Sequence, residues 1–179
     1  ADASRKEYKK INASTLLDMV VAAIQARADP VLIFADRISA ERPLATTPCA
    51  NQSLLSHESC PQGAINLAAI VERNHIAWEK LRRTVQVAVH FLDDCIDVSV
   101  YPDPAIEAAT KAHRKIGVGV MGYADMLVQL GLPYGSKKAL VETEKVMKFI
   151  SDEARKESAL IGKTKGSYAA LGQTKKPMR

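Results

Sequence analysis

The chain has 179 residues, enough for a domain with a hydrophobic core, and its 47% hydrophobic and 25% charged content is typical of a soluble globular protein. No apolar run approaches the roughly 18 residues of a membrane span, and the polar start ADASRKEYKK is unlike a secretion signal. The net charge of +5 is spread along the chain and only 5% of residues are aromatic, so we expect no DNA- or RNA-binding surface.

The first predicted element is a helix that Asn12 or Ser14 can cap and that stops at Asp29-Pro30. Its apolar residues recur at helical spacing and predict one buried face, formed by Leu16, Leu17, Val20, Val21 and Ile24. After it, the run VLIF at residues 31–34 is short and apolar, which favours a buried segment.

The middle of the chain is predicted as a loop followed by a strand. Residues 39–62 contain three prolines and no long period, which is typical of a loop. The apolar run AINLAAIV, residues 64–71, is expected to form a buried strand.

Two helices are predicted next. The first follows helical spacing from about residue 76 to residue 96 and must end before Tyr101-Pro102. Pro104 suits the first turn of the second, which is expected to run through about His113.

The last third of the chain is predicted as a strand and two more helices. KIGVGVMG is expected to form a strand or a strand-to-helix turn, and residues 123–130 form a short helix that Gly131 closes. Ser136 can cap a final helix that Gly166 ends. Its predicted inner face consists of Leu140, Thr143, Met147, Ile150, Ala154 and Ile161. Strands that alternate with helices predict a helix-rich α/β fold with a mainly parallel sheet, in one domain over residues 1–179.

Three glycines, Gly117, Gly119 and Gly122, match the G-x-G-x-x-G pattern of dinucleotide-binding loops. The residues before them, KAHRK, are not a buried strand. The acids at the distance expected of a ribose ligand, Glu142 and Glu144, fall inside a predicted helix. Close backbone packing is therefore favoured over cofactor binding at these glycines.

No metal site is predicted. The four histidines contain no pair spaced for a metal on one helical face, and neither Cys49 nor Cys60 belongs to a C-x-x-C pair. The third cysteine, Cys95, is expected to be a small buried apolar residue within a helix. An odd number of cysteines favours a reducing, cytoplasmic setting over a disulfide framework.

Two of the thiols, Cys49 and Cys60, lie in the proline-containing stretch TTPCANQSLLSHESCPQGAINL. They could be inert loop cysteines, or two thiols presented to one site for redox chemistry. Spacing and composition do not decide between these two interpretations.

Several long runs, in the same order, resemble the catalytic subunit of ribonucleotide reductases. They are DPVLIFADRI, TTPCANQSLLSHESCPQGAINL, AVHFLDDCIDVSVYP, HRKIGVGVMGYADMLVQLGLPY and EKVMKFISDEARKESA. The resemblance covers about residues 15–170 and is strongest to the form shared by adenosylcobalamin-dependent enzymes and many bacterial large subunits.

This resemblance implies part of a ten-stranded α/β barrel in which residues 43–63, approximately, form a finger loop. Cys49 matches the cysteine that becomes a thiyl radical and removes the 3′ hydrogen of the ribonucleotide. Cys60 matches one of two cysteines that supply electrons for deoxyribonucleotide synthesis. Adenosylcobalamin is the implied cofactor.

The finger loop departs from the family pattern Asn-Pro-Cys-Gly-Glu at important positions. Thr47 replaces the asparagine, and Asn51 replaces the glutamate that acts as general base at the 3′ hydroxyl. Asparagine does not accept a proton near neutral pH, so that role is lost as the sequence stands. Ala50, in place of glycine, is a milder change.

The resemblance spans about half of the family's barrel, so the sequence predicts a barrel fragment or a truncated paralogue that is inactive as a lone chain. A partner chain with the missing half, or a homo-oligomer, is expected to cover the open sheet edges. The alternative is a non-enzymatic scaffold or nucleotide-binding subunit. Thr47 and Asn51 favour this alternative, whereas Cys49 and Cys60 favour the enzyme.

Overall fold

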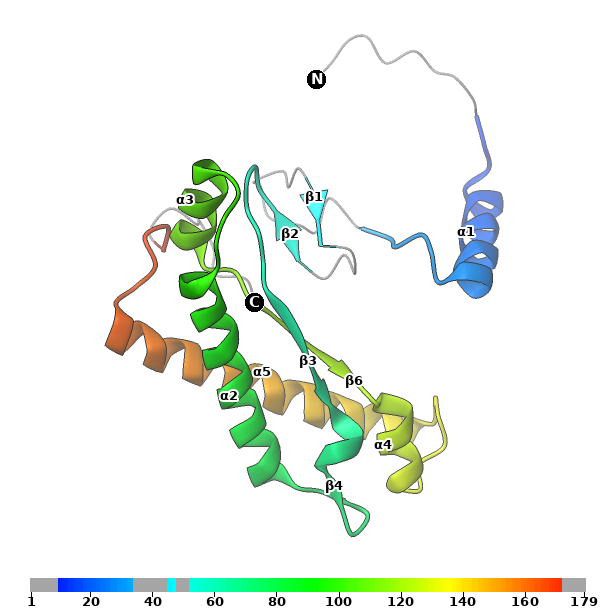
Figure 1. Ribbon diagram of the computed structural model, residues 1–179. Helices are drawn as coiled ribbons and strands as arrows, with labels where there is room; N and C mark the ends of the chain where they lie inside the picture. Colours follow the sequence, from blue (N-terminus) through cyan, green and yellow to red (C-terminus); the bar gives the residue numbers. More distant parts are fainter. Residues whose placement is uncertain (1–9, 34–44, 48–51, 172–179) are drawn as a thin grey trace.

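The computed structural model describes residues 10–33, 45–47 and 52–171 (Figure 1). In chain order the elements are α1 (Ala13–Arg27), β1 (Ala45–Thr46), β2 (Ser53–Leu54), β3 (Gln62–Asn66), the 3₁₀ helix η1 (Leu67–Ile70), β4 (Val71–Glu72), β5 (His75–Ile76), α2 (Trp78–Val98), α3 (Pro104–His113), β6 (Gly117–Met121), α4 (Tyr123–Gln129) and α5 (Lys137–Lys165).

Helices α1, α3 and α5 begin where the sequence predicts, and in each a polar side chain satisfies one of the first backbone N–H groups. Asn12 accepts a hydrogen bond from the Ser14 backbone N–H, and Ser136 accepts one from that of Ala139. Asp103 caps α3, and Pro104 occupies its first turn. The predicted ends of α2 and α5 are confirmed as well.

The central sheet consists of β3 and β6, which pair in parallel from Gln62↔Gly117 to Asn66↔Met121. The connection between them contains α2 and α3, so the unit is a β-α-β crossover. Two short antiparallel pairs, β1–β2 and β4–β5, complete the pairing within the described ranges. The predicted α/β architecture with many helices is confirmed, while residues 10–33, 45–47 and 52–171 do not close a barrel.

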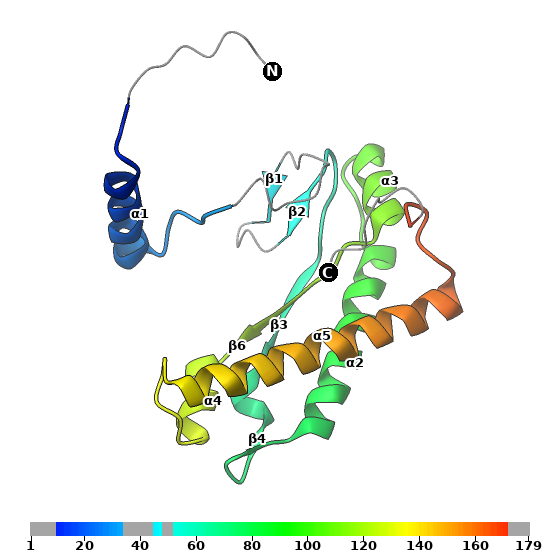
Figure 2. The same cartoon turned by 180° about the vertical axis from the view of Figure 1, so that it is seen from behind.

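The hydrophobic core lies where α2 packs against the sheet and α5 crosses α2, as the two opposite views show (Figures 1 and 2). Leu81, Val85 and Val89 line the inner face of α2 at helical spacing and are buried. Ile65 reaches this core from β3 and Met126 from α4. The exposed fractions of Leu81, Val85 and Met126 are 0%, so this part of the chain forms a packed core.

The three glycines of the motif lie in β6 and at the turn into α4. A side chain at Gly119 would lie 3.6 Å from the carbonyl oxygen of Gly63 in β3, and one at Gly117 would lie 3.0 Å from Gln62 Cγ. Gly122 has φ +67°, and a Cβ there would collide with Asn66 Oδ1. The turn into α4 therefore requires glycine at position 122, whereas the contact at Gly119 is an ordinary van der Waals distance.

The strand predicted over residues 64–71 was partly wrong, because β3 ends at Asn66. The Asn66 side chain accepts the backbone N–H of Ala68 at 3.1 Å and thereby starts η1. A second prediction, an uninterrupted loop over residues 39–62, needs correction because it overlaps β1 and β2.

The inner face of α5 is shifted from the prediction. Leu140 and Met147 are exposed, whereas Ala139 and Val146 are buried against the core together with the predicted Ile150 and Ile161. Ala139 and Val146 belong to the buried core cluster, which also contains Leu81 and Val85 of α2, so this row of α5, and not the larger apolar residues beside it, faces inward.

The apolar residues near the start of the chain are not buried among the described residues. Helix α1 forms as predicted, but it has no buried residue, and Val31, Leu32 and Ile33 are about half exposed. In both views α1 stands apart from the sheet and its helices (Figures 1 and 2). The prediction of a buried face for α1 is therefore wrong, and so is that of a buried run at residues 31–34 for its first three residues; Phe34 lies outside the described residues.

Along the described residues, no helix combines the length and the apolar content that a bilayer span requires.

Candidate functional site

Thr47 follows β1 and is held against Gln52, which precedes β2. The Thr47 backbone N–H donates to the Gln52 carbonyl at 3.0 Å, and the Gln52 N–H donates to Thr47 Oγ1 at 3.3 Å. Thr47 is only 5% exposed. Its hydroxyl therefore serves the local β1–β2 structure, as a short β-branched polar residue can do at the end of a strand.

Two of the four predicted site residues, Cys49 and Asn51, lie outside the described residues. They fall in the sequence between Thr47 and Gln52, so the described hydrogen bonds bracket them without locating their side chains. The roles implied for them remain predictions.

Cys60 lies directly before β3, on the segment that leads into the central sheet, and its side chain is half-buried. Its Sγ lies 3.7 Å from the Pro61 carbonyl oxygen, which is at most a weak interaction. Burial raises the pKa of the Cys60 thiol, the nearby Lys115 ammonium opposes that rise, and the Glu58 carboxylate adds to it. Cys60 is thus a protonated thiol with a charged pair beside it.

The segment carrying Cys60 is fastened to α3 by Ser59 and Thr110. Thr110 Oγ1 accepts the Ser59 backbone N–H at 3.1 Å and lies 3.0 Å from Ser59 Oγ. Thr110 is 1% exposed, so these hydrogen bonds form away from water. They fix the backbone next to Cys60.

A buried ion pair joins the two predicted parts of the site. Lys115 Nζ donates to Glu58 Oε2 at 2.6 Å and to the Ser53 backbone carbonyl in β2 at 3.1 Å. Glu58 Oε2 also accepts the Leu55 backbone N–H at 2.6 Å. The Glu58 side chain is 1% exposed, so the pair is shielded from solvent. Lys115 therefore ties the β1–β2 pair, which bears Thr47, to the segment that bears Cys60.

His113 approaches the other oxygen of the same carboxylate. Its Nδ1 lies 3.1 Å from Glu58 Oε1 and 3.1 Å from the Ala109 carbonyl oxygen in α3. Glu58 Oε1 is fully buried and has no hydrogen bond of good geometry in the described part of the chain. A second histidine, His90, also lies beside a carboxylate, with its Nε2 2.7 Å from Glu157 Oε1.

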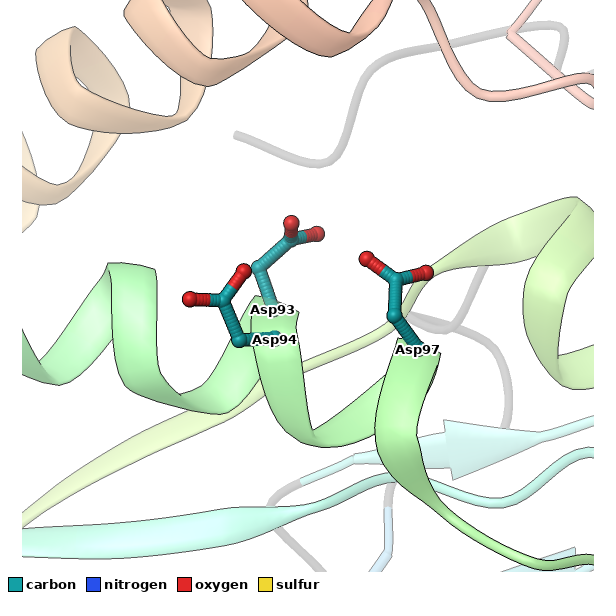
Figure 3. A group of neighbouring side chains, drawn as sticks. All are labelled: Asp93, Asp94 and Asp97. Carbon is teal, nitrogen blue, oxygen red and sulfur yellow. The ribbon is translucent and has the colours of Figure 1, made fainter.

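A second charged cluster lies on the side of α2 that faces α5 (Figure 3). The carboxylates of Asp93, Asp94 and Asp97 lie within 4.8 Å of one another. Arg114 Nε donates to Asp93 at 2.9 Å, and Lys165 Nζ donates to Asp93, Asp94 and Asp97 at 2.8, 2.6 and 2.9 Å. Two cations thus occupy the centre of the group, which we assign as an ion-pair cluster that joins α2 to the ends of α3 and α5.

The cluster shifts the acidity of its carboxyls. Hydrogen bonds from Arg114, and then from Lys165, lower the pKa of Asp97 far below its usual range. Burial works against ionisation of Asp93, but hydrogen bonds from the same two cations outweigh it and leave its pKa lowered too.

A cavity of about 1010 Å³ lies between α5, β6 and the segment after Gly166. Its lining includes Arg114 and Lys165 but neither Thr47 nor Cys60. The cavity is therefore separate from Thr47 and Cys60.

Sequence reasoning missed Glu58, Lys115 and Thr110. A single acid and a single lysine in polar surroundings give no signal of burial, and their contacts span 57 residues for Glu58–Lys115 and 51 for Ser59–Thr110. Cys95 was expected to be buried, but it is only half-buried because it lies beside the buried stripe of α2 and not within it.

Known proteins with similar sequences are ribonucleotide reductases. The family model of the ribonucleotide reductase barrel domain matches residues 1–178. A vitamin B12-dependent ribonucleoside-diphosphate reductase of Thermoplasma acidophilum is 42% identical over 175 residues, which are 93% of this chain and 23% of that protein. A protein of the same name from Mycobacterium tuberculosis is 39% identical over 93% of this chain and 25% of its own length.

A more distant relative is the ribonucleoside-diphosphate reductase subunit alpha of Chlamydia pneumoniae, 31% identical over 94% of this chain and 17% of its own length. The chain thus spans a quarter or less of these relatives. Because the family model covers nearly every residue, the chain belongs to the ribonucleotide reductase barrel-domain family.

Proposed function

We propose that this chain is part of a catalytic barrel that reduces ribonucleotides to deoxyribonucleotides, with Cys49 and Cys60 as its reacting thiols. One observation carries the proposal: Lys115 binds both Ser53 of β2 and Glu58, so the finger-loop strands and the Cys60 segment meet at one buried ion pair. Two thiols that act on one sugar must be held close to it, because reaction rates depend strongly on how the reacting groups are positioned. An ion pair that joins the two segments can hold them in place.

In the proposed reaction, a thiyl radical on Cys49 removes the 3′ hydrogen of the sugar. The two reducing thiols then supply two protons and two electrons: one proton lets the 2′ hydroxyl leave as water, a hydrogen takes its place at C2′, and the thiols become a disulfide. Cys49 finally returns its hydrogen to C3′ and is left as a thiyl radical again. Cys60 is one of the two reducing thiols, and its protonated state suits it to donate hydrogen. The second is supplied by a cysteine other than Cys95, in the remainder of the barrel.

Adenosylcobalamin is the radical source that we propose, because two relatives carry vitamin B12-dependent in their names. When bound, it supplies the radical that starts the chemistry. The described residues do not fit it by themselves, since the cavity of about 1010 Å³ lies away from Thr47 and Cys60. The steps assigned to this chain therefore involve its own residues alone.

The rest of the ten-stranded barrel is proposed to come from further chain or from a second subunit, with residues 1–179 as one domain and residues 43–63 as the finger loop. The exposed apolar residues of α1, including Leu17 and Ile24, support such a covering partner. A cytoplasmic setting belongs to the same proposal.

A non-enzymatic scaffold or nucleotide-binding subunit is the second candidate. Thr47 favours this candidate, because it replaces the family's longer asparagine and its hydroxyl already accepts a hydrogen bond from the Gln52 backbone. Asn51 favours it as well, because an asparagine side chain cannot act as a base.

The deciding experiment supplies the remaining barrel, as a fusion or a second chain taken from a vitamin B12-dependent relative, together with adenosylcobalamin. Deoxynucleotide formation is measured by chromatography. We expect low turnover with the natural finger loop and a gain on Asn51→Glu, because a positioned general base contributes about 10²–10⁴-fold. Thr47→Asn is expected to add to that gain.

Cys49→Ser is the matched control, since a hydroxyl hydrogen is much harder to remove than a thiol hydrogen. It should abolish all turnover. Full activity without either reversion would show that Asn51 is not limiting. Absence of turnover with both reversions would favour the scaffold.

A further inference from the structure

Glu58 is a buried carboxylate that the proposed reaction does not use. Its side chain is 1% exposed, and isolated charges are costly in such surroundings unless they are paired. It contacts Lys115 and the Leu55 backbone N–H through one oxygen and approaches His113 through the other. A carboxylate held from three directions is a fixed part of the structure.

Lys115 is the matching cation, and it comes from a different part of the fold. It lies between α3 and β6, and it reaches the Ser53 carbonyl as well as Glu58. Its side chain is 21% exposed. Contact with both segments means that moving Lys115 would release β2 and the loop before Cys60 together.

We propose that Glu58 and Lys115 form a positioning pair for the Cys60 thiol. Their ion pair holds the Cys60 segment against β2 and sets the electrostatic potential at the thiol. This inference rests on the proposed role of Cys60 as a reducing thiol. Neither residue touches the sugar; both act through the place and protonation of Cys60.

The electrostatics around the thiol support the pair. Among the groups that act on Cys60, Lys115 lowers its pKa and Glu58 raises it, while burial has the largest effect. His113 faces the same Glu58 carboxylate from α3. Removing one member of the pair should therefore move the pKa of Cys60 in one direction, and removing the other should move it in the opposite direction.

The test follows alkylation of Cys60 by iodoacetamide in the full chain as a function of pH. Fragment-ion mass spectrometry identifies the labelled residue, because trypsin leaves Cys49 and Cys60 in one peptide. The variants are Lys115→Gln, Lys115→Arg and Glu58→Gln. Lys138→Gln and Glu144→Gln are matched controls, since both residues are exposed on α5.

We expect Lys115→Gln to slow alkylation near pH 8 and Glu58→Gln to accelerate it. Each rate should change by about threefold per unit change in thiol pKa, because a lower pKa gives more thiolate but makes that thiolate less nucleophilic. Lys115→Arg should keep most of the natural rate, and the controls should leave it unchanged.

If the ion pair only held the loop in place, the alkylation rates of the variants would follow a different pattern. In that case both Lys115→Gln and Glu58→Gln would expose the thiol and accelerate its alkylation, without opposite shifts in the midpoint of the pH profile. That result, or unchanged rates in both variants, would overturn the proposal. The rates do not depend on turnover, so the two failures can be told apart: an inactive complemented barrel would count against the proposed function, whereas the alkylation rates test only the coupling of Glu58 and Lys115 to Cys60.

Discussion

Thr110 Oγ1 accepts the backbone N–H of Ser59 at 3.1 Å, across 51 positions of sequence. The hydrogen bond is buried, and it fixes the residue next to Cys60 to the last turn of α3. The position of a predicted catalytic thiol thus depends on a helix that contains no predicted site residue.

Thr110→Val should remove this anchor while preserving side-chain volume. We expect a loss of about 1–3 kcal/mol in the free energy of unfolding, because the Ser59 N–H loses its partner. Urea denaturation measures it. The control is Thr84→Val in α2. The Thr84 hydroxyl donates to the Lys80 carbonyl of its own helix, so this variant should change stability by less than about 0.5 kcal/mol. Equal effects would contradict the anchor.

Arg114→Met should destabilise the chain by about 1–3 kcal/mol, because Asp93 is buried and would keep only Lys165 as a cation. Arg114→Lys should recover part of the loss, since it restores charge without the planar fork. Arg83→Met, at an exposed position of the same α2 helix, is the control. A full recovery by lysine would show that geometry does not matter there.

Acid should weaken the fold through the same cluster. The pKa values of Asp93 and Asp97 are lower in the folded state than the ordinary value of 3.8. Their contribution is therefore present above that value and is lost as pH falls below it, because the unfolded chain binds more protons. The urea midpoint should decline below about pH 4, and Asp97→Asn should flatten the decline. Asp18→Asn, at an exposed position, should leave the decline unchanged. If Asp97→Asn also left it unchanged, the decline would not arise from protonation of this cluster.

Gly122→Ala and Gly162→Ala should have opposite effects on stability. At Gly122 a Cβ would meet Asn66 Oδ1 at φ +67°, so we expect a loss of about 2 kcal/mol or more. At Gly162, within α5, a Cβ would meet nothing within 4 Å, and alanine should stabilise the helix by about 0.5–1 kcal/mol. Thermal unfolding of both variants provides the comparison, and a harmless Gly122→Ala would mean that the turn into α4 can rearrange.

The exposed apolar face of α1 should drive association. We expect sedimentation of the chain as an oligomer at high micromolar concentration, and a shift toward the 19.5 kDa monomer when Leu17→Glu and Ile24→Glu are combined. Gln25→Glu adds charge to the same helix without removing apolar surface and serves as control. A clean monomer of the unaltered chain would refute the expected self-association.

The sequence by itself determined the local structure and the family. The caps at Asn12 and Ser136, Pro104 in the first turn of α3 and the stop before Pro102 act through neighbouring residues, so these helix boundaries could be read from short windows. The ordered runs that resemble ribonucleotide reductases were equally visible, and the barrel-domain match confirms them.

Only the tertiary structure decided which faces are buried and what surrounds Cys60. Periodicity predicted an inner face of α5 that includes Leu140 and Met147, but the packed structure buries the neighbouring residues Ala139 and Val146 in the core. The Glu58–Lys115 pair and the Ser59–Thr110 hydrogen bond arise from residues that no local pattern connects. Burial and ion pairing depend on the path of the whole chain, because a charge becomes a buried partner only after distant segments have packed around it.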